Sequence, residues 1–152
     1  MQNLNGGFKL IGLQLDKKTS NEAGQSGQDC GSLWRKFESE DYFKRVPDKL
    51  TDEIFAVYFD YEGDHTRPFS YFIGCQVQDS TEVPEGMSSL NIPRGSYTRL
   101  TTNGPMPDCV AHAWKEIWES PIERRYSYDF EVYGDKSRDW SNAEVEIYLS
   151  VK

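Results

Sequence analysis

The residues best suited to chemistry in this chain are carboxylates that alternate with apolar and aromatic side chains near the C-terminus. Asp129, Glu131 and Tyr133 are separated by Phe130 and Val132. Because successive side chains of a strand point to opposite faces, the two acids and the tyrosine would share one face. A carboxylate among aromatic rings attracts a lipophilic cation, and more strongly where water is excluded. Spacing alone favours a plainer interpretation, in which these acids form a solvated sheet face of an acidic protein.

A catalytic interpretation rests on weaker signals. Glu131 and Tyr148 could act as base and acid in a small hydrolysis, but such pairs are common in an acidic, tyrosine-rich chain. The sequence has no GxSxG, GxxxxGK[ST] or GxGxxG motif. Its two histidines, His65 and His112, have no third metal ligand at a familiar spacing. We therefore expect no metal site and no cofactor, and we keep enzymatic activity as an alternative.

Composition and charge restrict the remaining classes of protein. The 152 residues suit one domain, and 17 Lys+Arg against 25 Asp+Glu give a net charge of −8. A chain this acidic, without a basic cluster, lacks a surface that neutralises phosphates, so we expect no direct nucleic-acid binding. It has no apolar run of membrane-spanning length, no signal-peptide pattern and no CxxC pair among its cysteines. These features predict a cytoplasmic protein that does not bind membranes and whose charged partner, if any, is a cation.

The hydrophobic pattern predicts the same series of elements twice. An alternating segment at 7–15 precedes a polar stretch at 17–31, and an apolar stripe indicates a helix from about residue 28 to 39. Two β-like segments at 53–62 and 68–78 then predict a hairpin. A strand at 96–101, a helix at 108–120 and a hairpin of 125–133 with 143–151 repeat this order. We expect one α+β domain over residues 1–152, with halves at about 5–82 and 86–152 related by a pseudo-twofold axis and a groove at their junction.

The two faces of the predicted sheet differ in character. We expect the helices to cover the face that carries Phe130 and Val132. The opposite face would then present the carboxylates and the tyrosines, including Tyr58 of the first hairpin. At helical spacing, Trp34 and Trp114 are more typical of a core than of a ligand-binding surface.

Nine short segments form a recognisable pattern when they are taken in order. They are GFKLIGLQL at 7–15, LW..F at 33–37, IFAVYFDYEGD at 54–64, YFIGCQV at 71–77, VPEGM at 83–87, IPRGSYTRLTTNG at 92–104, AWKEIW at 113–118, RYSYDFEVYG at 125–134 and VEIYLSV at 145–151. In this order the chain resembles the gyrase-inhibitory-protein-like (GyrI-like) small-molecule-binding domains, also called AraC-type effector-binding domains. The resemblance implies two βαββ modules with antiparallel sheets and two helices, and an aromatic groove between the modules with a glutamate at its base.

The resemblance also implies roles for five residues. The glutamate of the family's FE.Y motif corresponds to Glu131, and Tyr148 matches the tyrosine commonly found beside it. Looser matches make Tyr58, Tyr97 and Trp114 candidates for the ligand pocket. Members of this family bind amphipathic or cationic drugs and effectors. Some are fused to DNA-binding helix-turn-helix domains, and a few resemble hydrolases of small strained-ring compounds.

We therefore predict reversible binding of a small hydrophobic or cationic ligand, in the service of transcriptional regulation or drug sequestration. The predicted elements leave no room for a helix-turn-helix, which favours a stand-alone binder. A small hydrolase that uses Glu131 and Tyr148, and a regulator directed at gyrase or another protein partner, remain the alternatives. The polar stretch at 17–31 is either a mobile flap over the groove or a plain surface loop.

Overall fold

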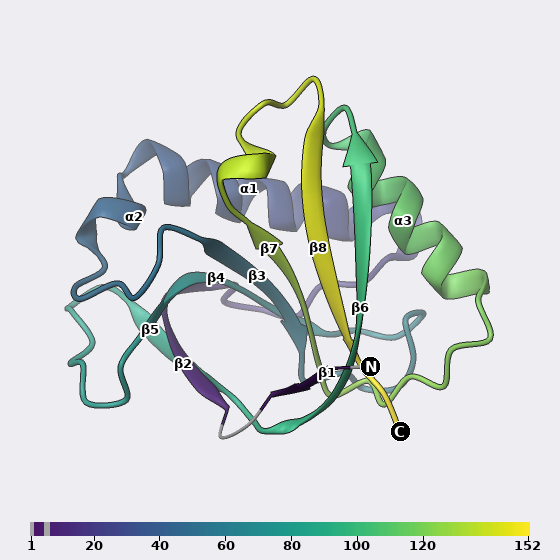
Figure 1. Ribbon diagram of the computed structural model, residues 1–152, viewed down its shortest axis with the longest axis horizontal. Helices are drawn as coiled ribbons and strands as arrows, with labels where there is room; N and C mark the ends of the chain where they lie inside the picture. Colours follow the sequence, from purple (N-terminus) through teal and green to yellow (C-terminus); the bar gives the residue numbers. More distant parts are fainter. Residues whose placement is uncertain (1, 5–6) are drawn as a thin grey trace.

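The computed structural model describes residues 2–4 and 7–152, and its strands form one continuous antiparallel sheet. The strand order is β1-β6-β8-β7-β3-β4-β2-β5 (Figure 1). This order is symmetric about the central β3–β7 pair, with β4 and β2 on one side and β8 and β6 on the other. The strands are β1 (Gln2–Leu4), β2 (Phe8–Gln14), β3 (Ile54–Phe59), β4 (Ser70–Val77), β5 (Ser88–Ile92), β6 (Gly95–Gly104), β7 (Tyr128–Tyr133) and β8 (Ala143–Ser150).

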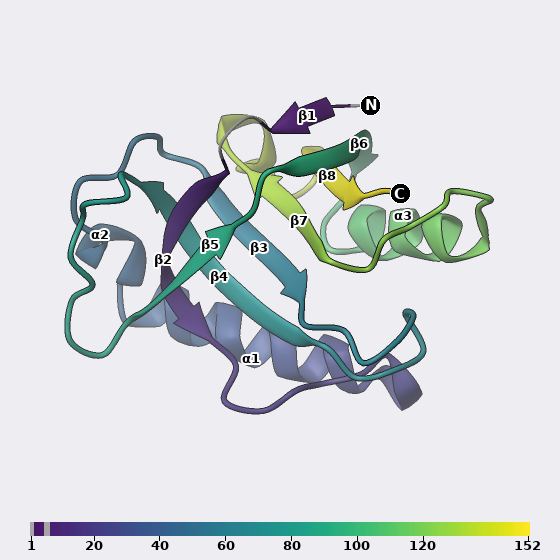
Figure 2. The same ribbon diagram turned by 90° about the horizontal axis from the view of Figure 1, so that it is seen from below.

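Two long helices pack against the same face of this sheet (Figure 2). Helix α1 (Gln25–Ser39) buries Leu33 and Phe37 against β2 and β4, and α3 (Asp108–Glu119) buries its apolar stripe against β8. A short helix α2 (Tyr42–Arg45) follows α1, and single 3-10 turns lie at Glu22–Gly24 and Asp135–Ser137. Tyr58 and Tyr133 pack against the cores below both helices, so they mark the junction of the two halves.

The predicted α+β fold of two βαββ modules is confirmed. Each half consists of a strand, a helix and an antiparallel pair of strands, β2-α1-β3-β4 and β6-α3-β7-β8. The halves also exchange the strands that precede them, because β1 pairs with β6 while β5 pairs with β2. The exchanged strands β1 and β5 form the two outer edges of the sheet. The division at residues 5–82 and 86–152 stays a prediction.

The prediction of which face the helices cover was wrong. Phe130 and Val132 lie on the face away from α1 and α3, where the curled sheet encloses a second core with Leu10, Val57 and Phe72. Glu131 lies on the helix-covered face. Alternation shows which residues share a face, but it cannot show which of two apolar faces receives the helices.

Some element boundaries also differ from the predicted ones. Helix α1 begins at Gln25, three residues before its predicted start near residue 28, and so takes in residues 25–31 of the polar stretch. Two glycines weaken helix propensity there, and the packing of Leu33 and Phe37 farther along the helix overrides it. Strand β5 has no alternating pattern and was not predicted; it exists through its pairing with β2. A flap role for the remaining loop stays a prediction.

A pair of facing glycines allows β2 and β4 to approach closely. Gly12 pairs with Gly74, and a Cβ on Gly12 would overlap the carbonyl oxygen of Ile73. Glycine in a strand interior commonly marks such an approach. The β2–β4 pair therefore has no space for a side chain at this point.

Candidate functional site

A cavity of about 1020 Å³ lies between α1 and α3, over the centre of the sheet. Its size suits a drug-sized molecule. Its wall is mostly apolar and aromatic, and a few polar groups converge on it. Its lining includes Trp34 of α1, Trp114 and Trp118 of α3, Tyr58, Tyr71, Glu131 and Tyr133 of the strands, and His65 and Arg124 of the loops.

The central strands place Glu131 at the base of this cavity. Strand alternation turns Glu131 and Tyr133 of β7 toward the helices. Directly across the β3–β7 pair, Glu131 faces Ala56, whose side chain is fully buried. The small methyl group of Ala56 leaves the space above it to the carboxylate and its partners.

The Glu131 carboxylate accepts three hydrogen bonds from aromatic side chains. Tyr133 Oη donates to Oε1 over 2.5 Å, while Trp114 Nε1 and Tyr58 Oη donate to Oε2 over 2.6 and 2.8 Å. The residue is only 2% exposed. Among the described residues, no lysine, arginine or histidine forms an ion pair with it. Its negative charge is therefore held by neutral donors alone.

Burial controls the protonation of this site. It raises the pKa of Glu131 above the usual value, and the three donated hydrogen bonds offset only part of that rise. Burial also holds the pKa of Tyr58, Tyr71 and Tyr133 well above the usual value, and the nearby charge of Glu131 adds to this. The phenols therefore remain neutral at physiological pH and keep their protons for hydrogen bonds.

Contacts between aromatic rings hold the side chains of the cavity wall in place. The ring centroids of Tyr58 and Trp114 lie 5.0 Å apart, and those of Trp34 and Tyr133 lie 5.1 Å apart. Trp34 Nε1 also donates to Tyr71 Oη over 2.7 Å. Such edge and tilted contacts, together with hydrogen bonds, hold these rings in defined positions before any ligand arrives.

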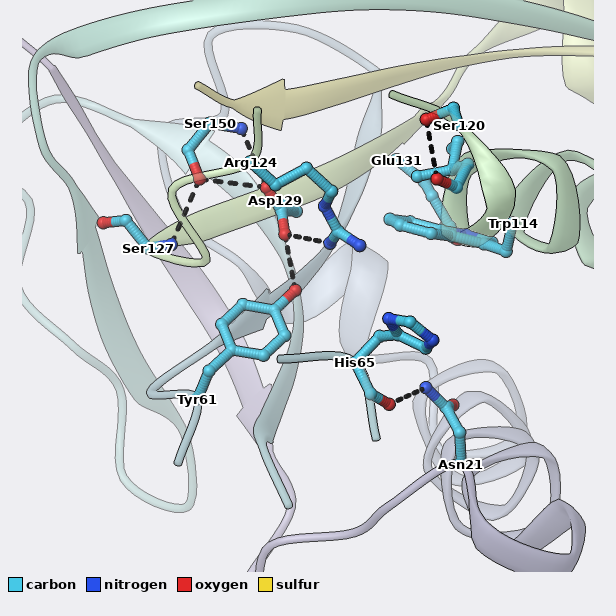
Figure 3. A network of polar contacts seen from close by, with 11 residues as sticks. Asn21, Tyr61, His65, Trp114, Ser120, Arg124, Ser127, Asp129, Glu131 and Ser150 are labelled. Atoms are coloured by element: carbon cyan, nitrogen blue, oxygen red, sulfur yellow. Dashed lines mark hydrogen bonds and ion pairs between the residues drawn. The ribbon is translucent and has the colours of Figure 1, made fainter. Parts of the chain in front are cut away.

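A second acid on the same strand, Asp129, differs from Glu131 because it has a cationic partner within the protein (Figure 3). It is fully buried and pairs with Arg124, whose Nη2 lies 2.8 Å from Oδ2. Tyr61 Oη donates to the same oxygen over 2.6 Å, and the Ser150 backbone N–H and hydroxyl donate to Oδ1. Its charge is thus neutralised inside the protein.

Three of the five predicted site residues meet in the structure. Glu131, Tyr58 and Trp114 all line the cavity and are joined by hydrogen bonds. Glu131 was located by the FE.Y motif, and the other two by looser matches to the same family.

The other two predicted residues, Tyr148 and Tyr97, lie on the opposite face of the sheet. Tyr148 pairs with Phe130 across β7–β8 and stacks on its ring at 4.9 Å. Tyr97 contacts Phe130 at 5.6 Å and belongs to the same second core. Paired residues of an antiparallel sheet share a face, so Tyr148 must lie opposite to Glu131. The structure therefore separates the expected acid partner, Tyr148, from Glu131.

The five residues predicted for the ligand site did not include Tyr133, Tyr71 or Arg124. For Tyr133 the signal was present, because it follows Glu131 by two residues and so shares its face. Arg124 precedes β7 in an irregular segment, and no local pattern connects it to a cavity. Its place is set by an isolated antiparallel bridge to Val151 and by the ion pair with Asp129.

Two other features are absent from residues 2–4 and 7–152. No three His, Cys, Asp or Glu side chains in this part of the chain are grouped so that they could hold a metal ion. None of its helices is long and apolar enough to cross a membrane.

The fold and the cavity define a GyrI-like effector-binding domain, which confirms the resemblance found in the sequence. The Cass2 family model, described as integron-associated effector binding protein, matches residues 6–151, and the chain belongs to this family. Family membership shows that the protein is an effector-binding domain for small molecules.

Known relatives extend over nearly the whole chain. YobU of Bacillus subtilis strain 168, named as a candidate transcriptional regulator, is 25% identical over 143 residues, which are 91% of this chain and 89% of YobU. The integron cassette protein VCH_CASS2 of Vibrio cholerae is 27% identical, with a TM-score of 0.73 over 99% of this chain and 94% of that one. SAV2435, solved bound to tetraphenylphosphonium, has the same fold at 18% identity, with a TM-score of 0.78 over 99% and 92% of the two chains.

Proposed function

We propose that the protein binds an aromatic or lipophilic cation in the cavity, with the positive charge placed near Glu131. The observation that carries this proposal is the buried Glu131 carboxylate, which no internal cation neutralises among the described residues. A buried charge is costly unless an opposite charge comes close, and the cavity leaves room for a ligand to supply one.

The aromatic wall adds a second source of affinity for the same class of ligand. Ring faces attract cations, with a contribution of about 2 kcal/mol where the contact is desolvated. The flat apolar surface of Trp34, Tyr58 and Trp114 also favours aromatic substituents around the charge. Tetraphenylphosphonium, which occupies the structurally similar SAV2435, is a ligand of this kind and therefore a suitable probe.

The proposed action is reversible burial of the ligand without a chemical step. By analogy with YobU, occupancy would report the presence of the effector to a transcriptional response. A hydrolytic function is less well supported, because Tyr148 does not reach the cavity and cannot serve Glu131 as the acid.

Calorimetric titration of tetraphenylphosphonium into the wild type and Glu131→Gln tests the proposal. Loss of one member of a buried charge pair should weaken binding by at least about tenfold. Glu85→Gln is the matched control, because it makes the same change on an exposed loop. Neutral triphenylphosphine oxide, a ligand of similar shape, should bind both proteins with similar affinity. Equal affinity of the wild type and Glu131→Gln for the cation would contradict the proposal.

A further inference from the structure

One part of the cavity wall carries hydrogen-bond donors that the protein leaves unused. Arg124 lines the cavity and is only 6% exposed. Its Nη2 donates to Asp129, but Nε and Nη1 are buried and have no acceptor within the part of the chain that the structure describes. Buried guanidinium donors without an acceptor are rare in native proteins, because each lost bond to water is uncompensated.

The neighbouring rings do not replace the missing acceptors. The guanidinium carbon lies 4.3 Å from the centroid of the Tyr126 ring and 5.7 Å from that of Trp114. Ring faces attract the charge of the guanidinium, but they are weak hydrogen-bond acceptors. The two N–H groups therefore keep unused donor capacity at the cavity wall, and because both nitrogen atoms are buried, an oxygen atom reaches them only when a neighbouring group moves aside.

The position of Arg124 relates these donors to Glu131. The indole of Trp114 donates its N–H to Glu131, while the guanidinium of Arg124 lies beside the same indole (Figure 3). One aromatic side chain thus separates an acidic group from a group of free donors. A single elongated ligand that packs along Trp114 could contact both.

His65 is another residue of the cavity wall with an unpartnered polar atom. Its imidazole stacks on the Trp118 ring with centroids 5.1 Å apart, and its Nδ1 is buried without a partner among the described residues. The backbone carbonyl of His65 accepts a hydrogen bond from Asn21 Nδ2 over 2.8 Å, which ties the β3–β4 loop to the segment before α1. The imidazole is thereby held at the cavity wall, where one tautomer would offer a further N–H.

The charge balance decides which acceptor suits these donors. Asp129 already neutralises Arg124, and four hydrogen bonds satisfy that carboxylate. A second carboxylate from the ligand would leave one buried negative charge in excess, whereas a carbonyl oxygen would not. We propose that the Arg124 end of the cavity is a subsite for a neutral carbonyl oxygen, so that the effector carries a cation at one end and a carbonyl group at the other. This inference rests on the proposed function for the cationic end alone.

A matched pair of ligands tests the subsite on the intact protein. Hexyltriphenylphosphonium and (5-oxohexyl)triphenylphosphonium differ only in one methylene group that is replaced by a carbonyl, and the pentyl and 4-oxopentyl pair shortens the reach. For at least one chain length the ketone should bind the wild type about fivefold or more tightly than its alkyl partner. In Arg124→Lys, which keeps a charge for Asp129 but loses the planar donors, this preference should disappear or reverse.

The outcomes separate the two proposals. If the alkyl cations bind through Glu131 but no ketone binds more tightly, the subsite is overturned and its donors are satisfied by water only. If no phosphonium binds, the proposed function fails, and benzophenone against diphenylmethane tests the subsite without a cation. Tighter binding of benzophenone, lost in Arg124→Lys, would support the subsite, and equal binding would overturn it. The comparison of ligands on the wild type decides the question even if the variant does not fold.

Discussion

Replacing Glu131 with glutamine should stabilise the ligand-free protein, and increasingly so as the pH rises. Burial raises the pKa of Glu131 above its ordinary value of 4.5, so the folded state binds this proton more tightly than the unfolded state. Between the ordinary and the raised pKa, stability therefore falls as the pH rises, and above the raised pKa it stays lower. Glutamine cannot ionise, so the variant should not show this fall.

The size of the effect follows from the same shift and from the local hydrogen bonds. A pKa raised by one is equivalent to about 1.4 kcal/mol of destabilisation by the charged form. The glutamine amide can keep the local contacts, since its oxygen can accept from Trp114 and Tyr58 while its NH₂ group donates to the Tyr133 oxygen. For a chain of this length each kcal/mol raises Tm by about 2–4 °C.

Urea denaturation of the wild type and Glu131→Gln from about pH 4 to about pH 8 measures the difference. The two proteins should differ least at the acid end, where the carboxyl group is neutral in both states. Glu85→Gln, an exposed change of the same kind, should follow the wild type throughout. A difference that does not grow with pH, or a variant that is less stable at the alkaline end, would refute the reasoning.

Three further predictions concern other parts of the site and the fold. Affinity for tetraphenylphosphonium should fall as the pH is lowered through the raised pKa of Glu131, and binding there should release a proton, which calorimetry in buffers of different ionisation enthalpy detects. Arg124→Met should lower the free energy of unfolding by about 3–5 kcal/mol, because Asp129 is left buried and unpaired. The double variant with Asp129→Leu should recover much of this loss in urea denaturation, and no recovery would argue against the charge as its cause. Gly12→Ala should abolish folding, which circular dichroism and soluble yield would detect. Gly27→Ala, at an open position of α1, should instead fold normally and raise the free energy of unfolding by up to about 1 kcal/mol.

The general architecture could be predicted from the sequence because its pattern is local. Alternation along the strands and a helical stripe in each half identified both βαββ modules without any knowledge of contacts. Strand β5 was missed because its stability comes from pairing with β2, at a distance in the sequence. The start of α1 was misplaced for a similar reason, since packing offsets the glycines at its N-terminal end.

The candidate site was predicted only in part, because a single sequence shows neither which buried face of β7 borders the cavity nor the register between β7 and β8. Alternation grouped Glu131 correctly with Tyr133, but both faces of β7 are buried, so hydrophobicity could not show which face borders a cavity. Tyr148 was expected beside Glu131, yet its pairing with Phe130 assigns it to the other face. That assignment depends on the register between β7 and β8, which a single sequence does not reveal.

The contrast between Asp129 and Glu131 explains why only one of them is a candidate binding group. The two acids are two residues apart on the same face of β7, and both are almost fully buried. Asp129 has an internal cation in Arg124, so any external cation there would have to displace an ion pair that is already formed. Glu131 receives only neutral donors, and its raised pKa shows that these do not fully replace water. Under the proposed function, a cation that enters the cavity removes a cost at Glu131 that the folded chain itself leaves in place, and we propose that this difference makes the site selective for positive charge.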